Sequence, residues 1–266
     1  MYRGSLCKLK VVAYPDTPAQ YTLSLGPDEL ALNPLLGKTL HLSFEGHIAC
    51  IRCGKSLRKS FAQGFCYTCF RSIPELDLCS VRPETCHFSK GTCRDPEWGR
   101  AHCFITHTVY LANSSGLKVG ITRTHLEQTR WLDQGARQAL PLLRVSKRID
   151  AGIVESALRQ HVGDRTNWRK LLKADAEPLD LLAKRDELLN SLPSRVAYRV
   201  AHDEAVRNFT YPLLAYPKKP VPLDLHKTSQ YEGILLGIKG QYLLFENAVL
   251  NVRKFTGYSV ALNFKS

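Results

Sequence analysis

The sequence has no apolar run of about 20 residues, the length that a helix needs to cross the hydrocarbon core of a bilayer. It also has no secretory leader, because charged and polar residues interrupt the opening stretch MYRGSLCKLKVVAYPD before an apolar run forms. These two absences exclude a membrane span and favour a cytoplasmic protein. We also find no convincing internal repeat.

Acidic residues are scarce relative to basic ones. The chain has 24 Asp and Glu against 37 Lys and Arg, a formal net charge of +13 and a pI near 9.4. Such an excess concentrates polyanions around the protein, and nucleic acid is the commonest polyanion in a cell. The hydrophobic fraction of 44% is ordinary, so 266 residues can fold into one to three packed modules. The composition therefore predicts a folded protein whose partner is DNA or RNA.

Nine cysteines are present, and stable disulfides are rare in a reducing cytosol. Two Cys-x-x-Cys pairs lie in CIRCGKSLRKSFAQGFCYTCF, and Gly54 and Gly64 flank them where tight backbone turns are expected. Each pair can reach one ion from a single turn, so two pairs supply a closed tetrahedral shell of thiolates. A thioredoxin-like redox site needs one pair near a βαβ unit and fits poorly. We predict a structural zinc site in a ribbon-like hairpin, with ligands Cys50, Cys53, Cys66 and Cys69.

A second group of cysteines follows in LCSVRPETCHFSKGTCRDPEWGRAHC, a stretch broken by Pro and Gly that has little apolar content. Core burial cannot order such a segment, whereas a metal ion can. We therefore predict a second zinc site, with His87 and His102 as substitute ligands. The alternative is four unrelated thiols that pack as small hydrophobes. The predicted ligands are Cys79, Cys86, Cys93 and Cys103, and Cys7 is expected to be a buried thiol in a strand.

The loop from Cys50 to Phe70, which contains the first two cysteine pairs, carries basic residues and no acidic residue. Phe61, Phe65 and Tyr67 accompany these cations, and such a mixture can grip phosphates and stack bases. The same aromatic residues would also serve as the small core of the module. The predicted nucleic-acid contacts in the loop are Arg52, Lys55, Arg58 and Lys59, and Arg123 joins them from a later strand.

The hydrophobic pattern divides the chain into four parts and predicts an α+β protein. Residues 1–48 and 216–266 read as β-rich segments that can pair with each other, and residues 49–104 form the cysteine-rich region. Residues 105–215 read as an α/β core with trailing helices. In this core, THTVYLANSSGLKVGIT predicts two strands. A helix should then begin at a capping box formed by Thr124 and Glu127 and end near Gly135.

The core then continues with a strand in LPLLRVSKRI. A second helix in AGIVESALRQHV should begin at Asp150 as its N-cap and stop at Gly163. A third helix is expected within EPLDLLAKRDELLNSL.

This order of elements over residues 107–163 resembles the GIY-YIG endonuclease superfamily. The matching stretches are TVYLA, LKVGIT, RTHLEQTRWLDQGA and VESALRQH, about a quarter of the chain. The whole chain also resembles an uncharacterised bacterial family that places cysteine-rich segments before such a core and a β-rich tail after it. The resemblance implies a small GIY-YIG-like mixed α/β core. It tells us more about the architecture of the protein than about its activity.

The resemblance also implies roles for individual residues. Tyr110 would act as general base or proton relay near the attacking water, and Gly120 would allow close backbone approach. Arg130 would steady the phosphate as charge builds, and Glu155 would bind Mg²⁺ or Mn²⁺. Phosphodiester hydrolysis needs a Lewis acid, an activated water and a cation for the transition state, and these residue types fit those needs.

The chain departs from the signatures of that superfamily in two places. The glycine before Tyr110 is absent, and Lys118 replaces the second tyrosine. Lys118 can stabilise a phosphate, but it also fits a site kept for binding alone. His107 and His125 lie near the signatures as possible proton carriers.

Three functions stay open at this point. The first is a metal-dependent nuclease acting on DNA or structured RNA. The second is a nucleic-acid-binding protein, for example of transfer RNA, that no longer cleaves. The third is a zinc-stapled scaffold for protein partners. If these residues have no catalytic role, we expect Tyr110 to pack at the end of its strand and Glu155 to lie on the solvent-exposed surface of its helix.

Overall fold

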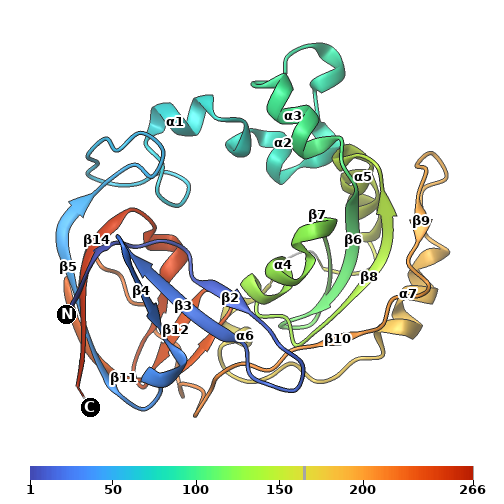
Figure 1. Ribbon diagram of the computed structural model, residues 1–266. Helices are drawn as coiled ribbons and strands as arrows, with labels where there is room; N and C mark the ends of the chain where they lie inside the picture. The colour runs from blue at the N-terminus through green and yellow to red at the C-terminus, as the bar shows by residue number, and fades with distance from the viewer. Residues whose placement is uncertain (164–165, 266) are drawn as a thin grey trace.

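The two ends of the chain build one antiparallel sheet of six strands. The structure, a computed structural model, describes residues 1–163 and 166–265. The strand order is β1-β14-β5-β11-β12-β13, so β14 from the C-terminus lies between β1 and β5 from the N-terminus. The expected pairing of the two end segments is confirmed, and Figure 1 shows the N- and C-termini close together. The strands are β1 (Tyr2–Ser5), β14 (Tyr258–Lys265), β5 (Thr39–Ile48), β11 (Gln230–Lys239), β12 (Tyr242–Phe245) and β13 (Val249–Asn251).

A second, three-stranded sheet packs against the first. Its order is β2-β3-β4, with β2 (Lys10–Val12), β3 (Gln20–Leu25) and β4 (Asp28–Ala31), and the 3-10 turn η1 (Asn33–Leu35) follows it. Alternate residues of β3 are buried, which is the pattern of a strand with one face toward a core. Those residues share one hydrophobic cluster with buried residues of β5, β11 and β14. Cys7, in contrast, is exposed, so the expectation of a buried thiol there is wrong.

The central part is a five-stranded antiparallel sheet with helices on it. The order is β10-β8-β6-β7, and β9 pairs with β8. β6 is buried along its whole length because it lies between β7 and β8 and is covered on both faces. Val109 and Leu111 face α5, whereas Tyr110 and Ala112 join the cluster of the terminal sheets through Trp131 of α4. The strands are β6 (His107–Asn113), β7 (Leu117–Arg123), β8 (Gln138–Val145), β9 (Arg199–Val200) and β10 (Arg207–Asn208).

The order strand, strand, helix, strand, helix that the sequence predicted is present in this part, but the helix starts differ. After the turn η5 (Thr124–Leu126), α4 (Glu127–Asp133) begins without a side-chain cap. Thr108 donates to the Glu127 carboxylate at 2.6 Å, so the predicted capping box is wrong. The chain does leave α4 through Gly135 with a φ of +66°, as expected of a glycine after a helix.

The second helix of the core is α5 (Arg148–Leu158), and it starts two residues before its predicted N-cap. Asp150 therefore lies in the first turn, where its charge still favours the positive end of the helix dipole. The predicted stop, Gly163, lies five residues beyond the end of the helix. Its carbonyl accepts from the Val119 amide at 2.9 Å instead.

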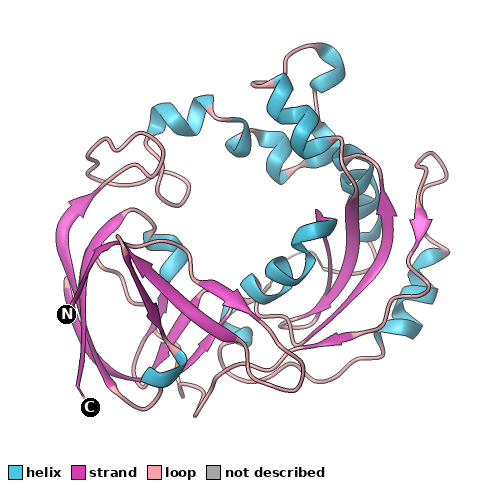
Figure 2. Ribbon diagram, viewed as in Figure 1, coloured by secondary structure: helices cyan, strands magenta, loops and turns pink. Residues whose placement is uncertain are grey.

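The cysteine-rich region forms an arch of short helices between the terminal sheets and the core, drawn in cyan at the top of Figure 2. Within the described residues, no strand forms between the two cysteine pairs, so the predicted ribbon hairpin is wrong. Two isolated bridges, Ala49 to Ser56 and Phe61 to Phe65, hold the loop instead. The helical elements are α1 (Tyr67–Ser72), η2 (Pro74–Leu76), α2 (Leu78–Val81), η3 (Pro83–Thr85), η4 (Phe88–Lys90) and α3 (Pro96–Cys103).

The trailing segment returns the chain from the core to the terminal sheets. It contains α6 (Trp168–Leu171) and α7 (Leu181–Leu189), and the turn η6 (Val252–Phe255) lies near the C-terminus. α7 is the expected third helix, and the Asp180 side chain caps it by accepting from the Ala183 amide at 2.9 Å. The fully buried Lys239 of β11 donates to Asp175 at 2.8 Å, which ties this segment to the terminal sheet. None of the described helices is both long and apolar enough to cross a membrane.

Candidate functional site

The four cysteines of the first block form one cluster. One sulfur atom from each of Cys50, Cys53, Cys66 and Cys69 lies within 4.8 Å of all the others. The sulfur atoms of Cys53 and Cys66 are 3.8 Å apart. Two sulfur ligands of a tetrahedral ion are expected about 3.8 Å apart when each metal–sulfur bond is about 2.3 Å long. This cluster can hold a metal ion.

Local backbone geometry brings these four sulfur atoms together. Cys50 lies two residues after the end of β5, and Gly54 turns the chain back with a φ of +72°. Cys66 is the N-cap of α1, so its sulfur accepts from the Cys69 amide at 3.3 Å. Gly64 cannot carry a side chain, since a Cβ there would lie 2.9 Å from the Thr256 carbonyl oxygen. The C-terminal turn therefore supports the cluster from outside the cysteine-rich region.

The electrostatics of the cluster favour some thiolates but not all. Burial opposes ionisation of Cys50, yet backbone N–H groups of Cys53 and Cys66 lower the pKa of its thiol to about 6. The pKa of Cys69 is raised to about 12, first because its thiol hydrogen-bonds Cys66 and then because it is buried. Negative charge on neighbouring sulfur atoms opposes further ionisation, so a bound cation is what allows four thiolates to coexist.

A large cavity of about 970 Å³ lies where the arch, the core and the terminal sheets face one another. Cationic residues outnumber acidic ones in its wall, and the acidic residues are Glu75, Asp77, Asp133 and Glu155. Apolar contacts come from the arch, where Leu78 and Val81 are exposed, and from Ile121 and Leu126 of the core. The cationic side chains come from every part of the fold: Lys8, Arg94, Arg123, Arg130, Arg148, Arg159 and Arg253.

Two of the predicted catalytic residues line this cavity, namely Arg130 of α4 and Glu155 of α5. The Glu155 side chain is 11% exposed, and Arg159 one turn later donates to it at 3.0 Å. The ordinary expectation of a surface glutamate is therefore wrong. Because Arg123 of β7 also lines the cavity, three predicted residues from three different elements meet there.

Tyr110 lies behind the cavity wall rather than in it. Its side chain is fully buried, and its hydroxyl donates to the Gln134 side chain at 3.3 Å. Burial raises the pKa of Tyr110, and the nearby Arg130 guanidinium opposes that rise by interacting with the hydroxyl. The Tyr110 hydroxyl therefore interacts with the Arg130 side chain from the side away from the cavity. Because Tyr110 is fully buried, it does not contact a water molecule in the cavity directly.

Lys118 belongs to the same buried network. It is 4% exposed, donates to Thr166 at 2.8 Å and also donates to the Gln134 side chain. Gln134 thus joins Tyr110 and Lys118, and the sequence interpretation missed it. The signal for it was present, because Gln134 lies four residues after Arg130 and so one helical turn along from it.

Gly120 is required by the ring of Tyr110, its partner across the β6–β7 pair. A Cβ at Gly120 would lie 2.6 Å from the ring carbon and from the hydroxyl of Tyr110. We expect Gly120→Ala to lower the free energy of unfolding by about 1–3 kcal/mol, the usual cost of an overpacked core. Gly163→Ala is the control, because its Cβ would meet only the Leu117 carbonyl at 3.7 Å. Urea denaturation of both variants measures the difference, and equal stabilities would contradict the packing role.

His107 is not a proton carrier at neutral pH. It is buried, and burial lowers the pKa of its imidazole to about 4, with help from the positive charges of Arg148, Arg123 and His125. Its Nδ1 faces the Ile105 carbonyl at 2.7 Å. His107 thus stays neutral in the folded state over a pH range in which the unfolded state, with a pKa near 6.5, takes up a proton.

Stability should therefore fall as the pH drops from about 6.5 to about 4, by up to about 3 kcal/mol from His107 alone. His107→Asn should flatten this part of the stability profile even if it lowers stability overall. The exposed His47, changed to Asn, is the matched control and should leave the slope unchanged. Denaturation midpoints across this pH range give the slope, and an equal slope in wild type and His107→Asn would refute the assignment.

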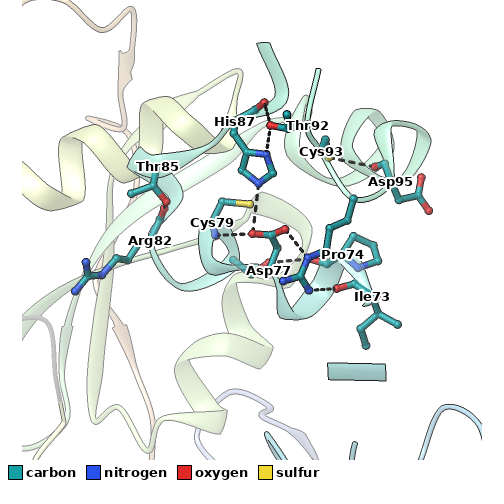
Figure 3. Close-up of polar contacts among 12 residues, drawn as sticks. Ile73, Pro74, Asp77, Cys79, Arg82, Thr85, His87, Thr92, Cys93 and Asp95 are labelled. Carbon is teal, nitrogen blue, oxygen red and sulfur yellow. Dashed lines mark hydrogen bonds and ion pairs between the residues drawn. The ribbon is translucent and has the colours of Figure 1, made fainter. Parts of the chain in front are cut away.

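The second group of cysteines surrounds a small pocket of about 20 Å³, and all four line it. Their sulfur atoms are less tightly gathered than those of the first block. The tighter potential metal-binding group here consists of Asp77, Cys79 and His87, whose ligand atoms lie within 4.8 Å of one another. Figure 3 shows the His87 ring and the Cys79 sulfur on the same side of Asp77. His102, the other substitute ligand, faces the Trp98 carbonyl through its Nδ1 at 2.8 Å.

The predicted nucleic-acid contacts in the cysteine loop do not line the cavity. The side chains of Arg52, Lys55, Arg58 and Lys59 are all exposed. Beside them, Phe61 contacts Tyr67 and Phe70 with ring centroids 5.4 and 6.4 Å apart, and both Phe61 and Tyr67 are exposed. The loop thus presents cations and aromatic faces to solvent, and its residues Ala62, Gln63 and Phe70 line the cavity.

The fold and the cysteine cluster define a mixed α/β protein with several sheets and a site for a metal ion. The chain belongs to the family described as protein of unknown function DUF2797, whose model matches residues 37–260. No curated protein and no solved structure matches the chain. The resemblance of the core to the GIY-YIG superfamily is not confirmed by these comparisons and stays an interpretation.

Proposed function

We propose that this protein binds nucleic acid in the central cavity and hydrolyses a phosphodiester bond there with a divalent metal ion. The observation that carries the proposal is the meeting of Arg130 and Glu155 in one cavity rich in cations, although they are 25 positions apart in the sequence. A volume of about 970 Å³ accommodates a few nucleotides of a single strand or an extruded loop. A protein with +13 net charge would draw such a polyanion to the cavity.

Each residue of the site has a role in this proposal. Glu155 would hold Mg²⁺ or Mn²⁺, which supplies Lewis-acid stabilisation of the phosphate. Arg130, held from behind by Tyr110, would neutralise charge that builds on the phosphate oxygens. Lys118 fixes Gln134 and so the last turn of α4, a positioning role. Arg159 donates to the Glu155 carboxylate at 3.0 Å and so orients it.

The first cysteine cluster would hold zinc in a structural role. Four thiolates leave no open position for water, and soft sulfur ligands in a tetrahedral set select zinc over magnesium or calcium. The ion would fix the loop that carries Arg52, Lys55, Arg58 and Lys59, so that these cations extend the binding surface beyond the cavity.

A second candidate function is nucleic-acid binding without cleavage. Two observations favour it: Tyr110 is fully buried, and Glu155 already pairs with Arg159. Both functions require the cationic cavity, and only the first requires the Glu155 carboxylate. A protein that binds no nucleic acid at low salt would contradict both and would favour the third function, a zinc-stapled scaffold.

The cavity itself is tested by salt dependence. The affinity for a fluorescent single-stranded RNA or DNA, measured between 50 and 200 mM salt, should fall steeply in wild type. Arg123→Gln combined with Arg253→Gln should reduce the slope of log affinity against log salt by about 0.7 per lost phosphate contact. Lys218→Gln with Lys219→Gln removes the same charge from an exposed site outside the cavity and should change the slope less. Equal effects of the two pairs would refute the cavity as the binding site.

A further inference from the structure

The arch between α1 and β6 lacks the usual means of holding a fold. Among the described residues, no side chain from residues 71–104 belongs to a hydrophobic cluster. Leu78 and Val81, which could have formed a core, are 59% and 72% exposed. Ordering about 30 residues costs on the order of 1 kcal/mol or more per residue in backbone entropy. Apolar contacts within the arch, such as Phe88 with Phe104 at 4.6 Å between ring centroids, are small against this cost, which leaves a role for a further stabilising interaction.

Four sulfur atoms converge at the centre of this segment. Cys79 lies in α2, Cys86 directly follows η3, Cys93 precedes the N-cap of α3, and Cys103 is the last residue of α3. All four line the same pocket of about 20 Å³, which is enough room for a single ion or water molecule. Four separate turns of the arch thus meet at one point, where a single ion could crosslink them.

The competing ligand set is less suited to an ion, because its polar atoms already have partners. The Asp77 carboxylate pairs with Arg94 at 2.7 Å and accepts from the Cys79 amide at 3.4 Å as the N-cap of α2. His87 faces Thr92 through Nδ1 at 2.8 Å and Asp77 through Nε2 at 3.4 Å, as the dashed lines in Figure 3 mark. His87 also does not line the pocket, whereas the four cysteines do.

We propose that Cys79, Cys86, Cys93 and Cys103 hold a second, soft metal ion of the zinc class, with Asp77 and His87 as positioning residues. On binding, the four thiols release protons to solvent and their sulfur atoms donate to the ion, with no change of oxidation state. The sulfur atoms would move together by side-chain rotation until they lie about 3.8 Å apart. The ion would then take the place of the missing core.

The second ion also acts on the cavity, because the arch packs directly against α5. Arg148 at the start of α5 donates to the Ser80 carbonyl at 2.7 Å. Gly152 lies so close to η3 that a Cβ there would be 2.6 Å from both the Pro83 Cβ and the Glu84 amide nitrogen. Glu155 follows Gly152 by about one helical turn. An ion that fixes the position of η3 therefore also fixes the position of the Glu155 carboxylate in the cavity wall. This last consequence rests on the proposed function, whereas the ion itself does not.

Metal stoichiometry tests the second site independently of any activity. The purified protein, loaded with zinc and washed free of excess, should contain two zinc ions per chain by elemental analysis. Cys86→Ser and Cys103→Ser should each contain one. Cys7→Ser and His87→Ala should keep two. One zinc in the wild-type protein, two in the cysteine variants, or a loss in His87→Ala without a loss in Cys103→Ser would each overturn the proposed ligand set.

A second measurement covers variants that fail to fold. Wild-type protein loaded with cadmium-113 should give two NMR resonances, both in the region of ions bound by four sulfur atoms. A single such resonance, or a second one shifted to the region of mixed nitrogen, oxygen and sulfur ligands, would contradict the proposal. Protease cleavage within residues 71–104 should increase when one equivalent of metal is removed. Because neither readout uses nucleic acid, failure of the second ion and failure of the proposed nuclease activity can be told apart.

Discussion

Glu155→Gln should abolish metal-dependent cleavage of nucleic acid while leaving its binding nearly unchanged. The substitution keeps the size of the side chain and removes the negative charge that would hold Mg²⁺ or Mn²⁺. The expected loss of rate is on the order of 10³-fold, comparable to removing one electrostatic stabiliser of a transition state. Affinity should change by less than about threefold, because the cationic residues of the cavity supply most of the binding energy.

The experiment compares initial cleavage rates of mixed single-stranded RNA and DNA with 5 mM Mg²⁺ or Mn²⁺, alongside affinities measured without metal. Asp150→Asn is the matched control, since it removes one carboxylate from the same helix outside the cavity. It should retain wild-type rates. If both proteins bind and neither wild type nor Glu155→Gln cuts, the second candidate, binding without cleavage, replaces the first. Cleavage that survives in Glu155→Gln would remove Glu155 from the mechanism.

Cys66→Ser should cause the largest loss of stability of any single substitution considered. Cys66 contributes a sulfur to the first metal cluster and is also the N-cap of α1. The hydrophobic cluster around it consists of Cys50, Cys66 and Cys69 themselves, with only Leu57 and Phe65 packed against them. Without the ion little apolar burial remains to order this loop, so we expect a loss of about 4 kcal/mol or more, as for other lost metal sites.

Thermal denaturation and metal content measure this prediction together. Cys66→Ser should bind one metal ion fewer than wild type and unfold at a markedly lower temperature. A strong chelator should destabilise wild type at least as much as the substitution does, because it also removes the ion proposed for the second group of cysteines. The exposed Cys7, changed to Ser, serves as the control and should keep both properties. A variant with full metal content and unchanged stability would exclude the cluster as a metal site.

The parts of the fold that the sequence predicted well are those fixed by local physical constraints. The two Cys-x-x-Cys pairs form tight turns by themselves, and a regular alternation of buried residues marks β3. The pairing of the chain ends was predicted from the two β-rich end segments, because chain termini often lie close together. The helix starts were not predictable, because long-range partners compete for capping side chains. Glu127 bonds Thr108 of the neighbouring strand instead of capping α4.

The residue types of the candidate site could be predicted from the sequence, whereas the burial of its residues could be predicted less well. The spacing of Arg130 and Glu155 along their helices, read through the resemblance, indicated two residues of one site, and both line the cavity. Burial of Tyr110 could not be inferred, since it depends on the packing of Trp131 and on the terminal sheets, which lie far away in the sequence. The positions of Lys8 and Arg253 in the cavity wall could not be predicted either, because the two ends of the chain come close to the cavity only once the terminal sheets have folded.

The most direct test of the account is the position of a divalent ion in the folded protein. Crystals soaked with Mn²⁺ and measured near the manganese absorption edge would locate the ion by its anomalous scattering. The account predicts a peak about 2.1 Å from a Glu155 carboxylate oxygen, inside the cavity and facing the Arg130 guanidinium. A cavity without such a peak at millimolar Mn²⁺, or manganese bound only elsewhere, would contradict the proposal that this protein cuts nucleic acid at Glu155.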